Sequence, residues 1–349
     1  TKKGTFTITP KSLKNCTAQI DKVTYSGSVK EPYVTVKLDG KSLWRGSDYT
    51  VQYENNVNAG TAKAVITGKG NYKDSRSVEF TIDPMSITDC YVAAADTQRY
   101  TGNALTPEVK IYAGIYNYYY GSPLDMKQGQ DYTVKYENNV NAGTANVEVT
   151  GKGNYTGTAT GTFTIAKSKS SITAKSFTKV YKAKAQSFKL GATTIGGKLT
   201  YKSSNKNITV SAKGVVTVKK GYVGKATITI TSAATKNCTK CVKKVTVTVN
   251  PASVKLSSVK NTASKKITVT WKKSTSTAVT GYQIQYSQKK DFSSGVKTVK
   301  VKGVKNVSKA ITKLTKGKTY YVRVRTYQVV SGKTYYSAWS AAKSVKITK

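Results

Sequence analysis

Apolar and polar residues alternate with a period of two along most of the chain. Tyr49, Val51 and Tyr53 fall on one face of such a segment, with polar residues between them. Alternation of this kind predicts half-buried β-strands. Runs rich in Gly and Asn separate the segments, and these residues suit tight connections. The pattern therefore predicts an all-β chain.

Two long stretches of the chain are near copies of each other. Residues 48–60 read DYTVQYENNVNAG and residues 131–143 read DYTVKYENNVNAG, and each stretch leads into the sequence TGKGNY. Self-similarity at a fixed spacing indicates one structural unit per repeat. We predict a first repeat at 10–83 and a second at 84–167.

A partial copy stands before the first repeat. Residues 4–8 read GTFTI, the same five residues as 161–165 at the end of the second repeat. We therefore expect residues 1–9 to be the last strand of a preceding repeat.

The ENNVNAG and GKGN motifs both predict turns. Asparagine and glycine tolerate the positive φ that a tight connection needs. A cation site at ENNVNAG is the alternative, but one Glu with amide oxygens is a thin ligand set for calcium. GKGN lacks the earlier Gly and the following Ser or Thr of a phosphate-binding loop. We expect neither a metal nor a cofactor.

The remaining sequence predicts two further modules, at 168–250 and 251–349, again with alternating strands. The 349 residues suit about four small domains better than one. The predicted architecture is a set of tandem β-sandwich modules arranged as beads on a string.

Three sets of motifs resemble known families. DYTV-x-YENNVNAGTA followed by TGKGNY resembles the bacterial immunoglobulin-like repeats found in large secreted proteins of anaerobic Gram-positive bacteria. Residues 199–234, with SSN, ITVSAKGVVT and GKATITI, resemble bacterial group 2 immunoglobulin-like domains. Residues 251–349 resemble a fibronectin type III domain, with Trp271 closing one strand and Tyr320 placed to cap the turn into another. The resemblance implies a secreted or cell-surface protein.

The chain contains no histidine. This removes the usual general base and the commonest metal ligand, so Ser-His-Asp and Cys-His arrangements cannot form from this chain. Paired carboxylates could still act, but the sequence points to no such pair in a cleft. We predict that the chain is not an enzyme.

Charge divides the chain into two unlike halves. Residues 1–148 carry a net charge of +2, whereas residues 149–349 carry +40 with Asp291 as their one acidic residue. Lysine supplies nearly all of this charge, which suggests diffuse contact with a repeating polyanion rather than the bidentate base reading typical of Arg. The alternatives are a solvated surface, an anionic cell-wall polymer or glycan, and nucleic acid, the last of which the lysine bias disfavours.

Aromatic residues mark two candidate binding loops. The second repeat has an insert of about eight residues relative to the first. Exposed tyrosines there would suit sugar rings or a protein partner, whereas an extended hairpin with its rings packed on the module is the structural alternative. Trp44 marks the same loop in the first repeat. The candidate ligand-binding residues are Tyr112, Tyr116, Tyr118, Tyr119, Tyr120 and Trp44.

A further candidate surface lies on the fibronectin-like module. On the fibronectin-like module, Tyr321, Arg323, Arg325 and Tyr327 alternate outward on one strand. They form either a recognition face or a structural cation–π ladder with Trp339, which resembles half of the Trp-Ser ladder of cytokine-receptor fibronectin domains.

The four cysteines fall into two kinds. Cys16 and Cys90 occupy the same position in successive repeats, too far apart to pair, and are expected to be buried free thiols. Cys238 and Cys241 flank a predicted two-residue turn, where a local disulfide could close.

These observations favour a non-catalytic stalk or adhesion region of a secreted or cell-surface bacterial protein, with its Lys-rich C-terminal modules contacting anionic wall or glycan polymers. The alternatives are a carbohydrate-binding accessory region of an extracellular enzyme and a host-protein-binding adhesin. We expect no membrane span, because no apolar run approaches the ~20 residues required, and we expect a monomer.

Overall fold

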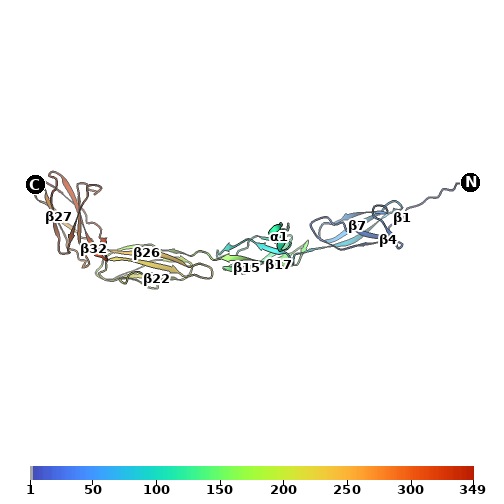
Figure 1. Ribbon diagram of the computed structural model, residues 1–349, viewed down its shortest axis with the longest axis horizontal. Coiled ribbons are helices and arrows are strands. Elements are labelled where there is room, and N and C mark those ends of the chain that lie inside the picture. The colour runs from blue at the N-terminus through green and yellow to red at the C-terminus, as the bar shows by residue number, and fades with distance from the viewer. Residues whose placement is uncertain (1–2) are drawn as a thin grey trace. The chain divides into compact units, whose positions relative to one another are not determined.

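The computed structural model describes residues 3–349, so residues 1 and 2 of the predicted 1–9 segment lie outside the described part (Figure 1). The chain divides into two compact units, Thr1–Lys167 and Ser168–Lys349. Within the described residues each unit holds two clusters of buried apolar side chains, and each cluster lies inside one set of β-sheets. The all-β, tandem-sandwich prediction is confirmed.

Repeat 1 is built from nine strands around one core. Its main sheet has the order β3-β9-β7-β6, a second sheet has the order β2-β4-β5, and β1 pairs with β8. The core includes Leu13, Val36, Tyr49, Ile66 and Ile82, all buried. The strands are β1 (Lys11–Ser12), β2 (Thr17–Ile20), β3 (Val23–Thr24), β4 (Val34–Leu38), β5 (Lys41–Leu43), β6 (Tyr49–Glu54), β7 (Gly60–Gly68), β8 (Tyr72–Lys73) and β9 (Ser75–Asp83).

Repeat 2 has the same plan with one substitution. Its main sheet has the order β12-β17-β15-β14, β11 pairs with β13, and β10 pairs with β16. A short helix follows β13, at the point where repeat 1 has β5 after β4. The elements are β10 (Met85–Ser86), β11 (Tyr91–Ala94), β12 (Gln98–Arg99), β13 (Val109–Tyr112), α1 (Ile115–Tyr120), β14 (Tyr132–Glu137), β15 (Gly143–Gly151), β16 (Tyr155–Thr156) and β17 (Thr158–Ala166).

The ENNVNAG motif forms a turn in both repeats. Asn55 and Gly60 adopt positive φ values of 54° and 131°, and the corresponding Asn138 and Gly143 do the same. The next residue, Asn56, donates from its side-chain amide to the backbone oxygen of Lys30 at 2.8 Å. A turn residue that tolerates positive φ therefore sits beside one that ties the loop to the preceding segment.

The GKGN motif also forms a turn, and its first glycine is required by close packing. A Cβ on Gly68 would lie 2.7 Å from the backbone nitrogen of Lys73, and Gly151 meets Thr156 in the same way. Gly70 and Gly153 have positive φ. Because the chain passes this closely over its own backbone, only glycine fits the first position.

The third module packs a four-stranded sheet, β19-β26-β25-β22, against a three-stranded sheet, β20-β24-β23. Its core includes Ile208, Val216, Ile228 and Val247. The strands are β18 (Ser171–Thr173), β19 (Phe177–Val180), β20 (Gln186–Lys189), β21 (Thr193–Ile195), β22 (Leu199–Ser203), β23 (Ile208–Val210), β24 (Val215–Val218), β25 (Gly224–Ser232) and β26 (Cys241–Asn250).

The fourth module also has two sheets. One has the order β27-β28-β31, and the other has the order β30-β29-β32-β33 with β34 paired to β32. The strands are β27 (Leu256–Ala263), β28 (Lys266–Trp271), β29 (Gly281–Ser287), β30 (Lys297–Lys302), β31 (Ser308–Ile311), β32 (Thr319–Val330), β33 (Lys333–Tyr336) and β34 (Lys343–Lys346).

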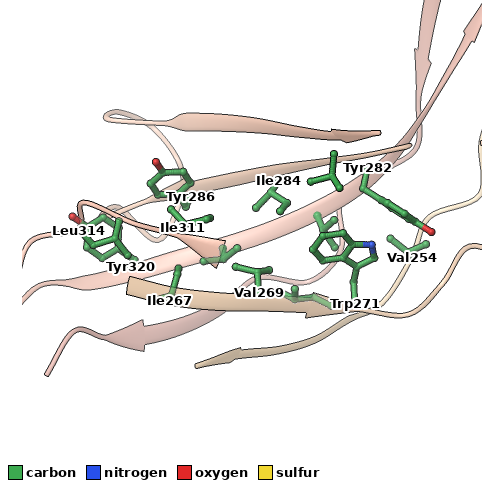
Figure 2. Close-up of a cluster of buried hydrophobic side chains, with 14 of the residues drawn as sticks. Val254, Ile267, Val269, Trp271, Tyr282, Ile284, Tyr286, Ile311, Leu314 and Tyr320 are labelled. Carbon is green, nitrogen blue, oxygen red and sulfur yellow. The ribbon is translucent and has the colours of Figure 1, made fainter. Parts of the chain in front are cut away.

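Alternate residues of β28 and β29 meet in the core of this module (Figure 2). The rings of Trp271 and Tyr282 lie 5.2 Å apart between centroids. The hydroxyl of Tyr320 accepts a hydrogen bond from the backbone nitrogen of Thr315 at 3.2 Å. Tyr320 therefore caps the turn into β32, as the sequence pattern predicts.

Candidate binding surfaces

The insert of repeat 2 forms a short tyrosine-rich helix rather than a loop or an extended hairpin. Gly114, with a φ of 90°, precedes α1, and Asn117 donates from its side chain to the backbone oxygen of Ala113 at 2.8 Å. Three tyrosines of α1 are more than two-thirds exposed. We name the exposed residues Ile115, Tyr116, Tyr119 and Tyr120 the tyrosine surface.

The tyrosine surface rests on buried and half-buried rings. Tyr118 packs against Tyr91 and Tyr112, with centroid distances of 4.5 and 5.4 Å. Tyr112 is buried, so its prediction as a ligand-binding residue is wrong: α1 covers the side of β13 on which it lies. Tyr118 is half-buried and acts as the anchor of the helix. Of the five predicted tyrosines, the structure leaves Tyr116, Tyr119 and Tyr120 exposed.

Trp44 belongs to a different module. It is 69% exposed on the turn between β5 and β6, and its backbone nitrogen donates to the Asp48 carboxylate at 2.8 Å. Lys127 holds the matching position in repeat 2, where its backbone nitrogen donates to Asp131. The six predicted aromatic residues therefore do not form one site.

A polar groove of about 520 Å³ lies in repeat 2 and shares Tyr91 with the ring packing beneath α1. Tyr91 lines it together with Lys135, Glu137, Asn146 and Glu148 from the outer face of β14 and β15. The hydrogen bond from Lys135, at 2.8 Å, lowers the pKa of the Glu137 carboxyl. A general acid needs the opposite shift, so this ion pair does not prepare Glu137 for that role. The sequence analysis did not identify Tyr91 or these two glutamates.

A second groove, of about 590 Å³, lies in the third module and is lined by lysines. Lys184, Lys206, Lys219 and Lys220 border it, and its other lining residues, Ala183, Ala185, Asn207, Thr209 and Thr217, carry no charge. We name these four residues the lysine groove. Since all four are exposed, their charges are solvated and available to a partner. Charge counting along the chain could not locate this groove, because its residues come from three separate segments.

The two arginines of β32 stack on aromatic rings. The Trp339 ring lies 4.7 Å from the guanidinium carbon of Arg323 and 4.2 Å from that of Arg325. Arg325 also lies 3.8 Å from the Tyr336 ring, and Arg323 lies 4.1 Å from the Phe292 ring.

Hydrogen bonds hold the same arginines from the neighbouring strand. Gln285 accepts from Arg323 at 2.7 Å, and Gln283 accepts from Arg325 at 2.7 Å. Burial lowers the pKa of both arginines. These contacts describe a structural ladder. Tyr327, which the alternation placed on the same outer face, is buried instead.

The four cysteines are all free thiols in the described chain. Cys238 and Cys241 are free thiols in the structure, and the connection between β25 and β26 runs over 233–240 rather than over a two-residue turn. Cys238 closes its own turn through Thr235, whereas Cys241 already pairs with Ser232 in the sheet. Burial raises the pKa of Cys16 and of Cys90. Within residues 3–349 no group of three or more His, Cys, Asp or Glu side chains could hold a metal.

Comparison with known proteins identifies the class of the fourth module. Residues 250–343 match the family model of the fibronectin type III domain, and these residues form such a domain. Fibronectin type III domains are typical of extracellular proteins and often mediate protein binding. Among residues 3–349, none of the helical structure is long and apolar enough for a membrane span.

The solved structures to which the chain is similar include both single and tandem domains. The fn3 domain of human contactin 1 is 21% identical, with 28% of this chain and 77% of that chain covered and a TM-score of 0.24. Domains A168–A170 of titin are 13% identical over 86% of this chain and 98% of that chain, with a TM-score of 0.26. The chicken CNTN1 FN1–FN3 domains are 13% identical over 76% and 99%, with a TM-score of 0.26. A search of curated proteins found no match.

Proposed function

We propose that this chain is a non-catalytic stalk or adhesion region of a secreted or cell-surface bacterial protein, and that the lysine groove binds an anionic wall or glycan polymer. The lysine groove is the observation that carries the proposal. Four exposed cations border one hollow without a neighbouring acid among its lining residues. A repeating polyanion can satisfy several of these charges at once, and such attraction weakens steeply with salt.

The surrounding charge supports the same partner. Residues 149–349 carry +40, so the field around the groove is positive over both C-terminal modules. Ion pairs between side chains, such as Lys63–Glu54 and Lys135–Glu137, occur in residues 1–148, where acids are available. The C-terminal lysines must instead find counter-charges in solution or on a partner.

The test is binding of poly(glycerol phosphate) to the full chain over a range of salt concentrations. Each lost contact at an exposed site is worth about 0.5 kcal/mol after screening, so alanine at Lys184, Lys206, Lys219 and Lys220 is expected to weaken binding about 30-fold. A matched variant removes four exposed lysines and changes the net charge equally: Lys202, Lys225 and Lys244 of the opposite sheet, and Lys198, which directly precedes β22.

The comparison of the two variants decides the proposal. A smaller loss in the matched variant supports a localised site. Equal losses would show that net charge alone attracts the polymer. Binding that survives deletion of 168–349 would refute the role of these modules altogether.

A second function is favoured by the tyrosine surface. Three exposed tyrosine rings lie on α1, whose Tyr118 packs on Tyr91. Tyr91 also lines a groove that offers carboxylates, an amide and a cation, and sugar rings are bound by such a mixture of stacking and polar groups. We propose that repeat 2 contacts a neutral glycan or a host protein here. Alanine at Tyr116, Tyr119 and Tyr120 should abolish this binding on a glycan array or serum-protein panel, whereas Trp44→Ala should leave it unchanged. The opposite result would move the site to repeat 1.

A further inference from the structure

Repeats 1 and 2 contact each other through residues of their shared motifs. The side-chain oxygen of Asn154, in the GKGN turn of repeat 2, accepts a hydrogen bond from the backbone nitrogen of Ala59 at 2.8 Å. Its side-chain nitrogen donates to the side-chain oxygen of Asn58 at 3.0 Å. Next to it, Tyr155 meets Tyr25 edge to face, with centroids 5.4 Å apart. One repeat therefore docks its GKGNY end onto the ENNVNAG end of the other.

The corresponding GKGNY residues of repeat 1 are more exposed than those of repeat 2. Asn71 and Tyr72 are the counterparts of Asn154 and Tyr155 in the shared sequence TGKGNY. Asn71 is exposed and Tyr72 half-buried, whereas Asn154 is half-buried and Tyr155 buried. Since the two turns have the same sequence and glycine conformations, the neighbouring repeat accounts for the difference in burial.

Residues 4–8 present a second open surface. Phe6 is 84% exposed and Ile8 75% exposed, in an extended segment that pairs with no described strand (Figure 1). Their counterparts at the end of repeat 2, Phe163 and Ile165, are 5% and 2% exposed. Two large apolar side chains in water forgo the burial free energy that the same residues gain in the repeats.

The pairing of β9 shows how a segment of this sequence is held when it lies inside a sheet. Phe80 lies opposite Ala62 of β7, and Ile82 lies opposite Val23 of β3, so β9 is held on both sides within its sheet. Two residues after Ile82 the next repeat begins at Pro84, and two residues after Ile8 repeat 1 begins at Pro10. Residues 4–8 thus precede repeat 1 at the same sequence spacing as β9 precedes repeat 2.

We propose that residues 4–8, together with Asn71 and Tyr72, form one docking surface for a further repeat of this kind, directly N-terminal in the same polypeptide. Residues 4–8 complete its main sheet, with Phe6 and Ile8 in its core. Asn71 bonds its ENNVNAG turn, and Tyr72 packs on its counterpart of Tyr25. The partner is defined by chemistry: an immunoglobulin-like repeat without a last strand of its own, whose turn presents an Asn side chain and a free backbone N–H.

The test fuses a copy of residues 10–77, which is repeat 1 without residues 78–83, directly to Gly4, so that the copy replaces residues 1–3 of the chain. Hydrogen exchange then follows the amides of residues 4–8 and the copied Ala59 amide. We expect the amides of residues 4–8 to exchange at unprotected rates in the original chain and at least 100-fold more slowly in the extended chain. As a control, a copy of residues 10–82 joined to Thr9 supplies β9 itself and shows that the added repeat folds.

Two sets of variants separate the parts of the surface. Phe6→Ser with Ile8→Ser should return residues 4–8 to unprotected exchange, whereas Thr5→Ser with Thr7→Ser should not, because the matching positions Glu79 and Thr81 face solvent. Asn71→Ala should speed exchange of the copied Ala59 amide about five- to tenfold, as expected for one lost hydrogen bond. Unprotected residues 4–8 in the extended chain would overturn strand completion, and an unchanged Ala59 amide in the Asn71 variant would overturn the docking contact.

Discussion

The arginine ladder of the fibronectin domain gives a quantitative prediction about stability. Trp339 lies between two guanidinium groups at 4.7 and 4.2 Å and is half-buried. Each cation–π contact contributes about 0.5–1 kcal/mol at a partly exposed site. Trp339→Ala removes both contacts and the apolar packing of the ring. We expect the free energy of unfolding of this domain to fall by about 3 kcal/mol, the lower end of the range for loss of a large aromatic side chain.

A double-mutant cycle isolates the electrostatic part of this loss. The measurement is the opening free energy from hydrogen exchange at the Ile284 amide, whose strand is paired on both sides, because a local probe reports on this domain rather than on the whole chain. Trp339→Ala and Arg325→Ala should couple by about 1 kcal/mol. Lys309→Ala, an exposed change on the opposite sheet, should be additive with Trp339→Ala. A coupling energy below about 0.3 kcal/mol between Trp339 and Arg325 would show that the ring stabilises the domain through packing and not through cation–π attraction.

Four further changes test other parts of the fold. Burial, with the neighbouring Tyr25 phenol, raises the pKa of Tyr155 from 10.0 to about 12. Because Tyr155 ionises at lower pH in the unfolded chain, the free energy of unfolding of the first unit should fall as pH rises from about 10 to 12. Tyr155→Phe should remove this pH dependence in thermal melts. Burial raises the pKa of Cys16, so iodoacetamide should label it only after unfolding, as mass spectrometry can show. Gly68→Ala should destabilise repeat 1 by about 2 kcal/mol or more in urea, because its Cβ would meet backbone at 2.7 Å, whereas Gly4→Ala should be neutral. Tyr320→Phe should cost the fibronectin domain about 1 kcal/mol through the lost bond from Thr315.

Local sequence predicted the strands and turns because their causes are local. Tyr49 lies between polar neighbours and is buried, as a period-two strand requires. The second glycine of GKGN and the first Asn of ENNVNAG have positive φ, which their residue types allow at low cost. Because repeats 1 and 2 share these motifs, the same strands and turns could be predicted in both.

The candidate site could be predicted only in part, because its burial depends on contacts between distant segments. Alternation along β13 does not reveal that α1 folds back and places Tyr118 on Tyr112. The lysine groove brings Lys184 next to Lys206 and Lys219 because β20 and β23 both pair with β24, a pairing that no local pattern specifies. The predicted two-residue turn between Cys238 and Cys241 is wrong for the same reason, because the length of the loop is set by where β26 begins against β25.

Different residues of the two repeated turns, ENNVNAG and GKGN, make different contacts, and these contacts explain the residue types. In ENNVNAG of repeat 1, Asn55 supplies the positive φ, Asn56 ties the loop to Lys30, and Asn58 faces the next repeat. Asn154 must both accept from a backbone N–H and donate to an amide oxygen, and a carboxylate in its place could only accept. An aspartate there would also place a negative charge against the Asn58 oxygen. The amide is therefore a requirement of the contact between repeats, while the glycines beside it are requirements of the fold within each repeat. A sequence that keeps the glycines and loses this asparagine should retain the module and lose the docking.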